Sequence, residues 1–188
     1  MKKMNNKGFS LVELIVVVLI MAIIAVALAP QVMKWVENSR VSTDCTNYES
    51  MIENLQLAIS DKEVYKEISA EGVTGYTKVV IDDKKTAIDG CTAASQSVAI
   101  TTMPTHTASG TPTATTICDF INWSLSKIDA SWAKIAKKAS GTVSGKDAAD
   151  ADQSNKNFYE IKVEFGKQAN VKRTGLSPET LKNGTDLS

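Results

Sequence analysis

The chain has 188 residues, of which 43% are hydrophobic, 22% charged and 6% aromatic. Its 21 Lys and Arg residues balance its 21 Asp and Glu residues, so the formal net charge is zero. This composition excludes a disordered chain, which combines low hydrophobicity with high net charge. It also lacks the basic excess that nucleic-acid-binding proteins usually carry, and we expect no nucleic-acid partner.

The first thirty residues combine a basic start with a long apolar run. Three lysines precede an unbroken apolar stretch at residues 14–29, and no acidic residue comes before Glu13. Basic residues before an apolar segment keep the N-terminus in the cytoplasm and direct the C-terminal part across the membrane. At about 1.5 Å per residue, a helix over residues 9–29 reaches roughly 30 Å, which is enough to span a bilayer.

An ordinary secretory signal peptide has the same general pattern. Small-x-small cleavage sites are present at residues 25–27 and 27–29, although Pro30 hinders cleavage at the second. Glu13 counts against this interpretation, because a carboxylate inside an apolar membrane segment costs on the order of 2.5–3.5 kcal/mol and usually has a partner. A segment that is destroyed soon after export has no use for such a residue.

Residues 7–14, KGFSLVEL, resemble the N-terminal signature of type IV prepilins and the related pseudopilins. The resemblance implies that a membrane prepilin peptidase cleaves after Gly8 and that Phe9 becomes the N-methylated first residue. It further implies that Glu13 is the acidic residue used in fibre assembly and that Pro30 kinks the helix. The new amine of one subunit could neutralise Glu13 of a neighbour in the apolar fibre core. Losing one partner of such a buried pair costs about 3–5 kcal/mol, so the pair would report subunit register.

The same resemblance implies an α+β, pilin-like fold, with a long kinked N-terminal helix packed on a small head that contains an antiparallel sheet and a second helix. We expect a leader at residues 1–8, a membrane or fibre-core helix at 9–30, the amphipathic half of the same helix at 31–60, and a globular head at 61–188. Apolar residues spaced by three and four support the amphipathic half, and they are Val41, Cys45, Tyr48, Ile52, Leu55 and Ile59. The whole helix would be about 75–80 Å long and interrupted only at Pro30.

Within the head, the pattern predicts a short helical turn, several strands and one more helix. Strands are expected at residues 76–82, 97–103 and 158–165, with a hairpin partner for the last at 168–173. The second amphipathic helix is expected at 118–139, loops at 104–117 and 140–157, and a frayed tail at 174–188. Charged side chains mostly lie off the apolar positions of these elements. Asp44 lies off the stripe of the long helix, Lys137 and Lys138 lie toward the other face of the helix at 118–139, and Glu160 alternates with the apolar residues of the strand at 158–165.

Three cysteines allow three different single disulfides, and the sequence does not choose among them. Cys45 lies on the apolar stripe and is interpreted as a core residue. Cys91 and Cys118 enclose a loop outside the membrane, where disulfides persist, and we favour this pairing. No cysteine follows Cys118, so the C-terminal disulfide loop of many Gram-negative pilins is absent.

Other candidate sites are weak. His106 is the single histidine and lies in a Thr-rich loop without other metal-ligand types nearby in the sequence. Asp147, Asp150 and Asp152 do not have the spacing of a calcium loop. The sequence contains no nucleophile elbow and no phosphate-binding loop. We therefore expect no metal site, no cofactor and no enzymatic activity.

These observations predict a structural subunit of a type IV pilus, with roles in adhesion or motility. The resemblance implies that the subunit spans the bacterial cytoplasmic membrane once with its head outside, and then joins an extracellular fibre of identical subunits. Implied partners are membrane lipid, the prepilin peptidase and methyltransferase, and an inner-membrane assembly platform with a cytoplasmic ATPase. The alternatives are a pseudopilin of a type II secretion or competence system, with a cell-envelope pseudopilus, and a minor pilin. A secreted binding module and a membrane-anchored extracellular enzyme are more distant alternatives.

Overall fold

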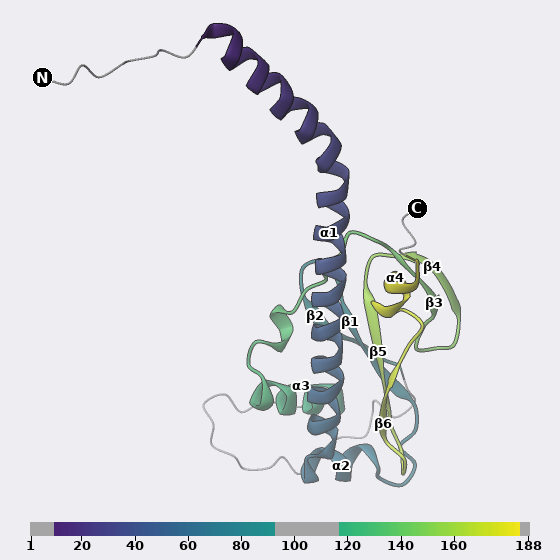
Figure 1. The fold of residues 1–188 in the computed structure, drawn as a ribbon. Coiled ribbons are helices and arrows are strands. Elements are labelled where there is room, and N and C mark those ends of the chain that lie inside the picture. The colour runs from purple at the N-terminus through teal and green to yellow at the C-terminus, as the bar shows by residue number, and fades with distance from the viewer. Residues whose placement is uncertain (1–9, 93–116, 185–188) are drawn as a thin grey trace, which may run out of the picture. The chain divides into compact units, whose positions relative to one another are not determined.

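The computed structural model describes residues 10–92 and 117–184 of the chain, which divides into two compact units at residues 1–39 and 40–188. Helix α1 contributes to both units, as the purple-to-blue ribbon of Figure 1 shows. The predicted strand at 97–103 and most of the predicted loop at 104–117 lie outside the described residues.

The predicted long N-terminal helix is confirmed as α1 (Leu11–Ser60), which is 50 residues long. It continues through Pro30 without the expected interruption, although proline lacks the N–H that would bond to the carbonyl oxygen of Val26. Burial along α1 begins at Val41 and ends at Ile59. Over that stretch the buried positions follow the predicted stripe, with Met51, Ala58 and Asp44 added to it.

The head contains a four-stranded antiparallel sheet in the order β2-β1-β5-β6. Its strands are β2 (Thr86–Thr92), β1 (Tyr76–Ile81), β5 (Tyr159–Glu164) and β6 (Asn170–Arg173). The predicted strand at 158–165 is thus observed as β5, one of the two inner strands of the sheet, and its hairpin with residues 168–173 is confirmed. Gly166 lies in the connecting turn with φ +111°, a conformation that glycine adopts without strain.

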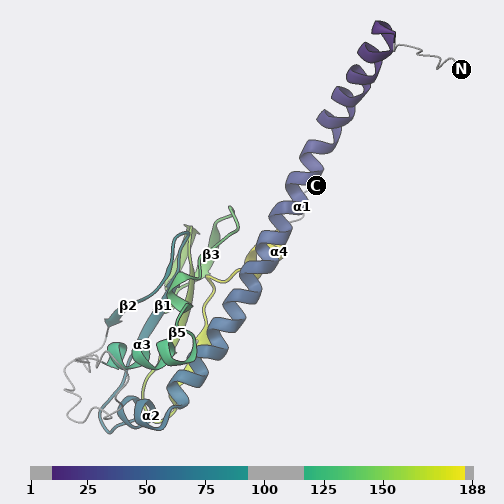
Figure 2. The same ribbon diagram turned by 90° about the vertical axis from the view of Figure 1, so that its left-hand side faces the viewer.

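The head half of α1 and the sheet lie side by side in both ribbon views, with the short helices α2 (Lys62–Ile68) and α3 (Ile117–Ile128) at one end (Figures 1 and 2). One hydrophobic core joins these elements. Its most deeply buried members from α1 and the sheet have at most 2% of their surface exposed, and they include Tyr48, Met51, Leu55, Val79, Ile81, Ile161 and Val163. The observed architecture is therefore a pilin-like α+β fold with an antiparallel sheet, as the sequence predicted.

The predicted helix at 118–139 is wrong in its second half, because α3 ends at Ile128. The carboxylate of Asp129 accepts hydrogen bonds from the main-chain N–H of Ser131 at 2.8 Å and from its hydroxyl at 2.7 Å. Such a local side-chain bond competes with the helix. Only the short 3₁₀ helix η2 (Trp132–Lys134) follows, and residues 135–142 have no regular structure.

Two further predictions for the head are wrong. Residues 140–157 are not a plain loop, since β3 (Val143–Lys146) and β4 (Asp152–Lys156) form a separate two-stranded sheet there. The tail is not frayed over its described part, since Leu176 is fully buried and α4 (Glu179–Gly184) follows it. The main-chain N–H of Gly175 donates a 2.7 Å hydrogen bond to the carbonyl oxygen of Lys146, which fixes the tail to β3.

Candidate functional site

The first candidate site is the apolar stretch of α1 between Leu11 and Val36. No side chain is buried between Ser10 and Arg40, a range that the structure describes completely. Large apolar side chains there leave between 45% and 77% of their surface exposed. Exposed apolar surface on this scale marks a contact with a membrane or with other protein.

This stretch also meets the length and composition expected of a membrane span. Helix α1 is the one helix in the described residues that passes this test, and its most apolar 18-residue window has a mean hydropathy of 3.2. The head half of α1 is distinguished from this stretch by its buried stripe and its polar partners.

The predicted residues of the N-terminal motif fall on both sides of the first described residue, Ser10. Gly8 and Phe9 lie outside the described residues. Glu13 lies in the first turn of α1 with an exposed side chain, and Pro30 lies inside the helix. A carboxylate in the first turn interacts favourably with the positive end of the helix dipole. This local effect does not provide Glu13 with the counter-charge that an apolar environment demands.

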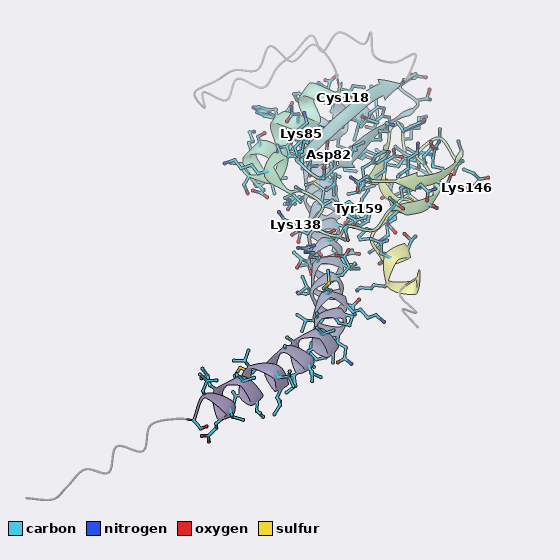
Figure 3. All side chains as sticks on the ribbon, turned by 90° about the horizontal axis from the view of Figure 1, so that it is seen from above. Asp82, Lys85, Cys118, Lys138, Lys146 and Tyr159 are labelled. Carbon is cyan, nitrogen blue, oxygen red and sulfur yellow. The ribbon has the colours of Figure 1, made fainter. Side chains whose placement is uncertain are left out.

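The second feature is a buried polar cluster that joins α1 to the head, which the sequence pattern did not reveal. The predicted place of Asp44 on the polar side of the helix is wrong, because only 2% of it is exposed. Its carboxylate accepts hydrogen bonds from the main-chain N–H groups of Lys138 and Ala139 at 2.7 and 2.8 Å, and from the hydroxyl of Tyr159 at 2.8 Å. Figure 3 shows the labelled Lys138 and Tyr159 on the head beside α1.

Lys137 belongs to the same cluster and is also wrongly predicted, because its side chain is buried and not on an exposed helix face. Its ammonium group donates hydrogen bonds to the carbonyl oxygen of Ala139 and, at 3.1 Å, to the side-chain oxygen of Asn157. The nitrogen also lies 5.6 Å from the centre of the Tyr159 ring, within the range of a cation–π contact. Helical spacing could have shown Asp44, which follows Val41 by three residues, but not Lys137.

Glu160 is a third missed residue. It occupies an outward position in the alternating pattern of β5, yet only 1% of it is exposed. Its carboxylate accepts a hydrogen bond from the main-chain N–H of Ala148 and lies 3.5 Å from the ammonium group of Lys78. The turn that carries Ala148 therefore covers this part of the outer sheet face. A cavity of about 90 Å³ remains there, lined by residues including Tyr76, Lys78 and Glu160.

The three cysteines have different surroundings. Cys45 is a free, buried cysteine, so its predicted place in the core is confirmed. Burial raises the pKa of its thiol, and the neighbouring Lys182 opposes this only in part. Cys118 is disulfide-bonded, and its sulfur lies 3.4 Å from the hydroxyl oxygen of Thr77. The backbone of Cys91 lies in β2, but its side chain is not among those described, so the predicted pairing with Cys118 stays a prediction.

The remaining candidate residues are His106 and the aspartates between residues 147 and 152. His106 lies outside the described residues. Asp147 is a turn residue, whose carboxylate accepts hydrogen bonds from the N–H groups of Ala149 and Ala151 and from the side chain of Gln153. Burial alone would raise its pKa, but these hydrogen bonds outweigh burial and lower it. Within the described part of the chain, no three His, Cys, Asp or Glu side chains are grouped closely enough to hold a metal ion.

The long apolar helix, its buried head half and the antiparallel sheet are consistent with the pilin fold. Residues 3–29 match the family model of the prokaryotic N-terminal methylation motif, which is the signature of type IV pilins. The motif supports a type IV pilin-like or pseudopilin protein, and it implies a structural subunit. Searches of curated proteins and of solved structures found no match.

Proposed function

We propose that this chain is a structural subunit of a type IV pilus. The observation that carries the proposal is the methylation motif at residues 3–29, continued by a helix whose apolar side chains are exposed as far as Val36. In this proposal residues 1–8 are a leader, 9–30 a membrane and fibre-core helix, 31–60 its amphipathic half and 61–188 the head. The subunit spans the cytoplasmic membrane with its head outside until it joins the fibre.

The processing step is cleavage after Gly8 by a prepilin peptidase, followed by methylation of the new N-terminal amine on Phe9. Unlike cleavage at residues 25–27, this step leaves the apolar segment attached to the head. The subunit then leaves lipid for a fibre core of similar apolarity, so the transfer itself has little hydrophobic driving force. An assembly platform with a cytoplasmic ATPase would supply the energy, and this chain needs no cofactor for its part.

Glu13 has the most specific role in this mechanism. The amine of Phe9 in a neighbouring subunit carries the opposite charge, and pairing neutralises both groups in an environment without water. Because an unpaired carboxylate there is costly, only subunits in the correct register gain the pair. The pair thus selects the register, and the apolar surface between Leu11 and Pro30 provides the contact area.

The test is an intact mass and an N-terminal sequence of the protein isolated from its own cells. A mature chain that begins at Phe9 with one extra methyl group supports the proposal. A chain that begins at Leu28 or later lacks Glu13 and the apolar helix, and would overturn it. Sheared filaments and electron microscopy separate the remaining roles, because a pseudopilin or minor pilin begins at Phe9 without forming abundant long filaments of this chain.

A matched pair of variants tests the role of Glu13. Glu13→Gln removes the negative charge from the apolar part of α1, whereas Glu53→Gln removes an exposed charge from its head half. We expect Glu13→Gln to lower the amount of filament by at least about tenfold, with the membrane level of the subunit unchanged. Equal filament yields from both variants would remove Glu13 from the mechanism.

We also propose that Cys118 pairs with Cys91. Cys118 is disulfide-bonded and Cys45 is free. In the register of β1 with β2, Tyr76 lies opposite Thr92 and Lys78 opposite Asp89, so the backbone of Cys91 passes close to Thr77, which contacts Cys118. Peptide mapping without reduction should recover residues 91 and 118 in one linked peptide. Recovery of Cys118 linked to Cys45 or to a second chain would contradict this pairing.

A further inference from the structure

Helix α1 contacts the rest of the head through two hydrophobic clusters, which differ greatly in size. The main core contains Tyr48, Met51, Leu55 and Ala58 from α1, none of which has measurable exposed surface. The stretch of α1 just before Tyr48 belongs to a separate, much smaller cluster. That cluster consists of Val41, Cys45 and Ala139, with Leu181 packed against it.

What holds the smaller part closed is mainly the polar cluster around Asp44. Three groups from residues 138, 139 and 159 donate hydrogen bonds to the carboxylate, and the buried ammonium group of Lys137 donates one to the carbonyl oxygen of Ala139 in the same cluster. Burying a charged carboxylate and a charged amine costs hydration free energy. This cost offsets most of the stabilisation that their hydrogen bonds contribute. Opening this part restores that hydration and exposes little apolar surface, so its free-energy cost is far below that of exposing the main core.

We propose that residues 41–47 of α1 and residues 137–139 form an openable latch, which separates locally while the rest of the head stays folded. Asp44 is the residue that keeps this latch closed. Opening stops at Tyr48, because that side chain is fully buried and bonded to β5. The latch is the part of the helix-to-head contact that opens most easily, and it lies on α1 directly after Arg40. This inference does not depend on the proposed function.

Cys45 provides a reporter in the middle of the latch. Its thiol is free and only 8% exposed, so a thiol reagent reaches it only after the latch or the whole head has opened. The experiment measures the labelling rate of Cys45 in the full chain in detergent micelles, with iodoacetamide as the reagent and peptide mass spectrometry as the readout. The rate is followed over a range of urea concentrations below global unfolding.

Local and global opening respond differently to urea, because the sensitivity depends on the surface exposed. We expect a labelling rate that is nearly independent of urea at low concentration, and that follows global unfolding only near the transition. A rate that follows global unfolding at every concentration overturns the proposal. This urea dependence is measured on the unmodified chain, so the test does not require any variant to fold.

Two variants then locate the closing contact. Asp44→Asn weakens the acceptor of three hydrogen bonds, and we expect it to raise the labelling rate at low urea by about tenfold. Ser124→Ala is the matched control, since the Ser124 hydroxyl donates a buried 3.2 Å hydrogen bond to Ala58 at the other end of the helix-to-head contact. It should lower global stability without changing the labelling rate of Cys45 at low urea.

Tyr159→Phe, which removes a single donor to Asp44, should raise that labelling rate by less than Asp44→Asn does. Equal effects of Asp44→Asn and Ser124→Ala would contradict the latch.

Discussion

The hydroxyl of Tyr48 on α1 donates a 2.8 Å hydrogen bond to the main-chain carbonyl oxygen of Glu160 on β5, 112 residues further along the chain. The ring of Tyr48 also meets that of Tyr159 edge-on, with 6.4 Å between the ring centres. Burial raises the pKa of Tyr48, so the phenol keeps its proton and remains a donor at all physiological pH values. One side chain thus joins the long helix to the central strand through both a polar and an aromatic contact.

Replacing Tyr48 with Phe tests the polar part of this contact. The Glu160 carbonyl oxygen keeps a second donor, the Thr174 hydroxyl at 2.8 Å, so the variant leaves no buried acceptor empty. We therefore expect a loss of about 1 kcal/mol in the free energy of unfolding, measured by urea titration of the full chain in detergent. Tyr65→Phe is the control, because Tyr65 is 44% exposed and its hydroxyl lies 3.4 Å from its acceptor. A loss as large for Tyr65→Phe would contradict this account.

Two leucines of α1, two positions apart, test which face of the helix is in the core. Leu55 has no exposed surface, whereas Leu57 is 59% exposed. Leu55→Ala removes buried methyl groups and leaves a cavity, and we expect it to cost about 2–5 kcal/mol. Leu57→Ala should change the free energy of unfolding by less than about 0.5 kcal/mol. Thermal unfolding of both variants gives the comparison, and similar losses would mean that α1 packs in a different rotation.

The elements that the sequence predicted well have patterns set by their own residues. The apolar stripe of α1 and the alternation of β5 each repeat over several periods, and both elements are observed. The helix predicted at 118–139 is wrong beyond Ile128. Ile128, Trp132 and Ile135 keep a helical spacing in the sequence, but the backbone is no longer α-helical after Ile128. All three pack on the core from different local conformations. Periodicity therefore indicated burial correctly and conformation wrongly.

The burial of Asp44 and Glu160 was not predicted, for a different reason. A carboxylate is buried when donors reach it, and the donors to Asp44 come from residues 94, 95 and 115 positions away. The same holds for Glu160, which the turn at Ala148 covers. No local pattern contains that information. The N-terminal motif is the opposite case, because a peptidase reads it as a short sequence and its recognition does not require the fold.

The docking of the β3–β4 hairpin on the tail depends on two facing glycines. A Cβ atom on Gly145 would lie 2.5 Å from the carbonyl oxygen of Gly175, which is backbone and cannot turn aside. We expect Gly145→Ala to cost about 1–3 kcal/mol and to speed hydrogen exchange of the Gly175 amide, which bonds to Lys146. In Gly141→Ala the new Cβ meets only the tip of the Leu181 side chain, so that variant should cost much less. Unchanged exchange at Gly175 in Gly145→Ala would refute the close backbone packing.

The acid stability of the sheet should depend on Glu164. Hydrogen bonds from Lys172, at 2.6 Å, and from Lys162, at 3.1 Å, hold the pKa of this carboxyl below its ordinary value of 4.5, against the opposing effect of burial. A pKa that is lower in the folded state means stability that is present above pH 4.5 and is lost as the pH falls through the folded value. We expect Glu164→Gln to lose about 0.5–1 kcal/mol at pH 7 and to flatten the fall in stability below pH 4.5. Urea titrations at a series of pH values measure both effects, and Glu71→Gln controls for removing one exposed negative charge. A Glu164→Gln profile parallel to that of the unmodified chain below pH 4.5 would show that these lysines do not stabilise the ionised carboxyl.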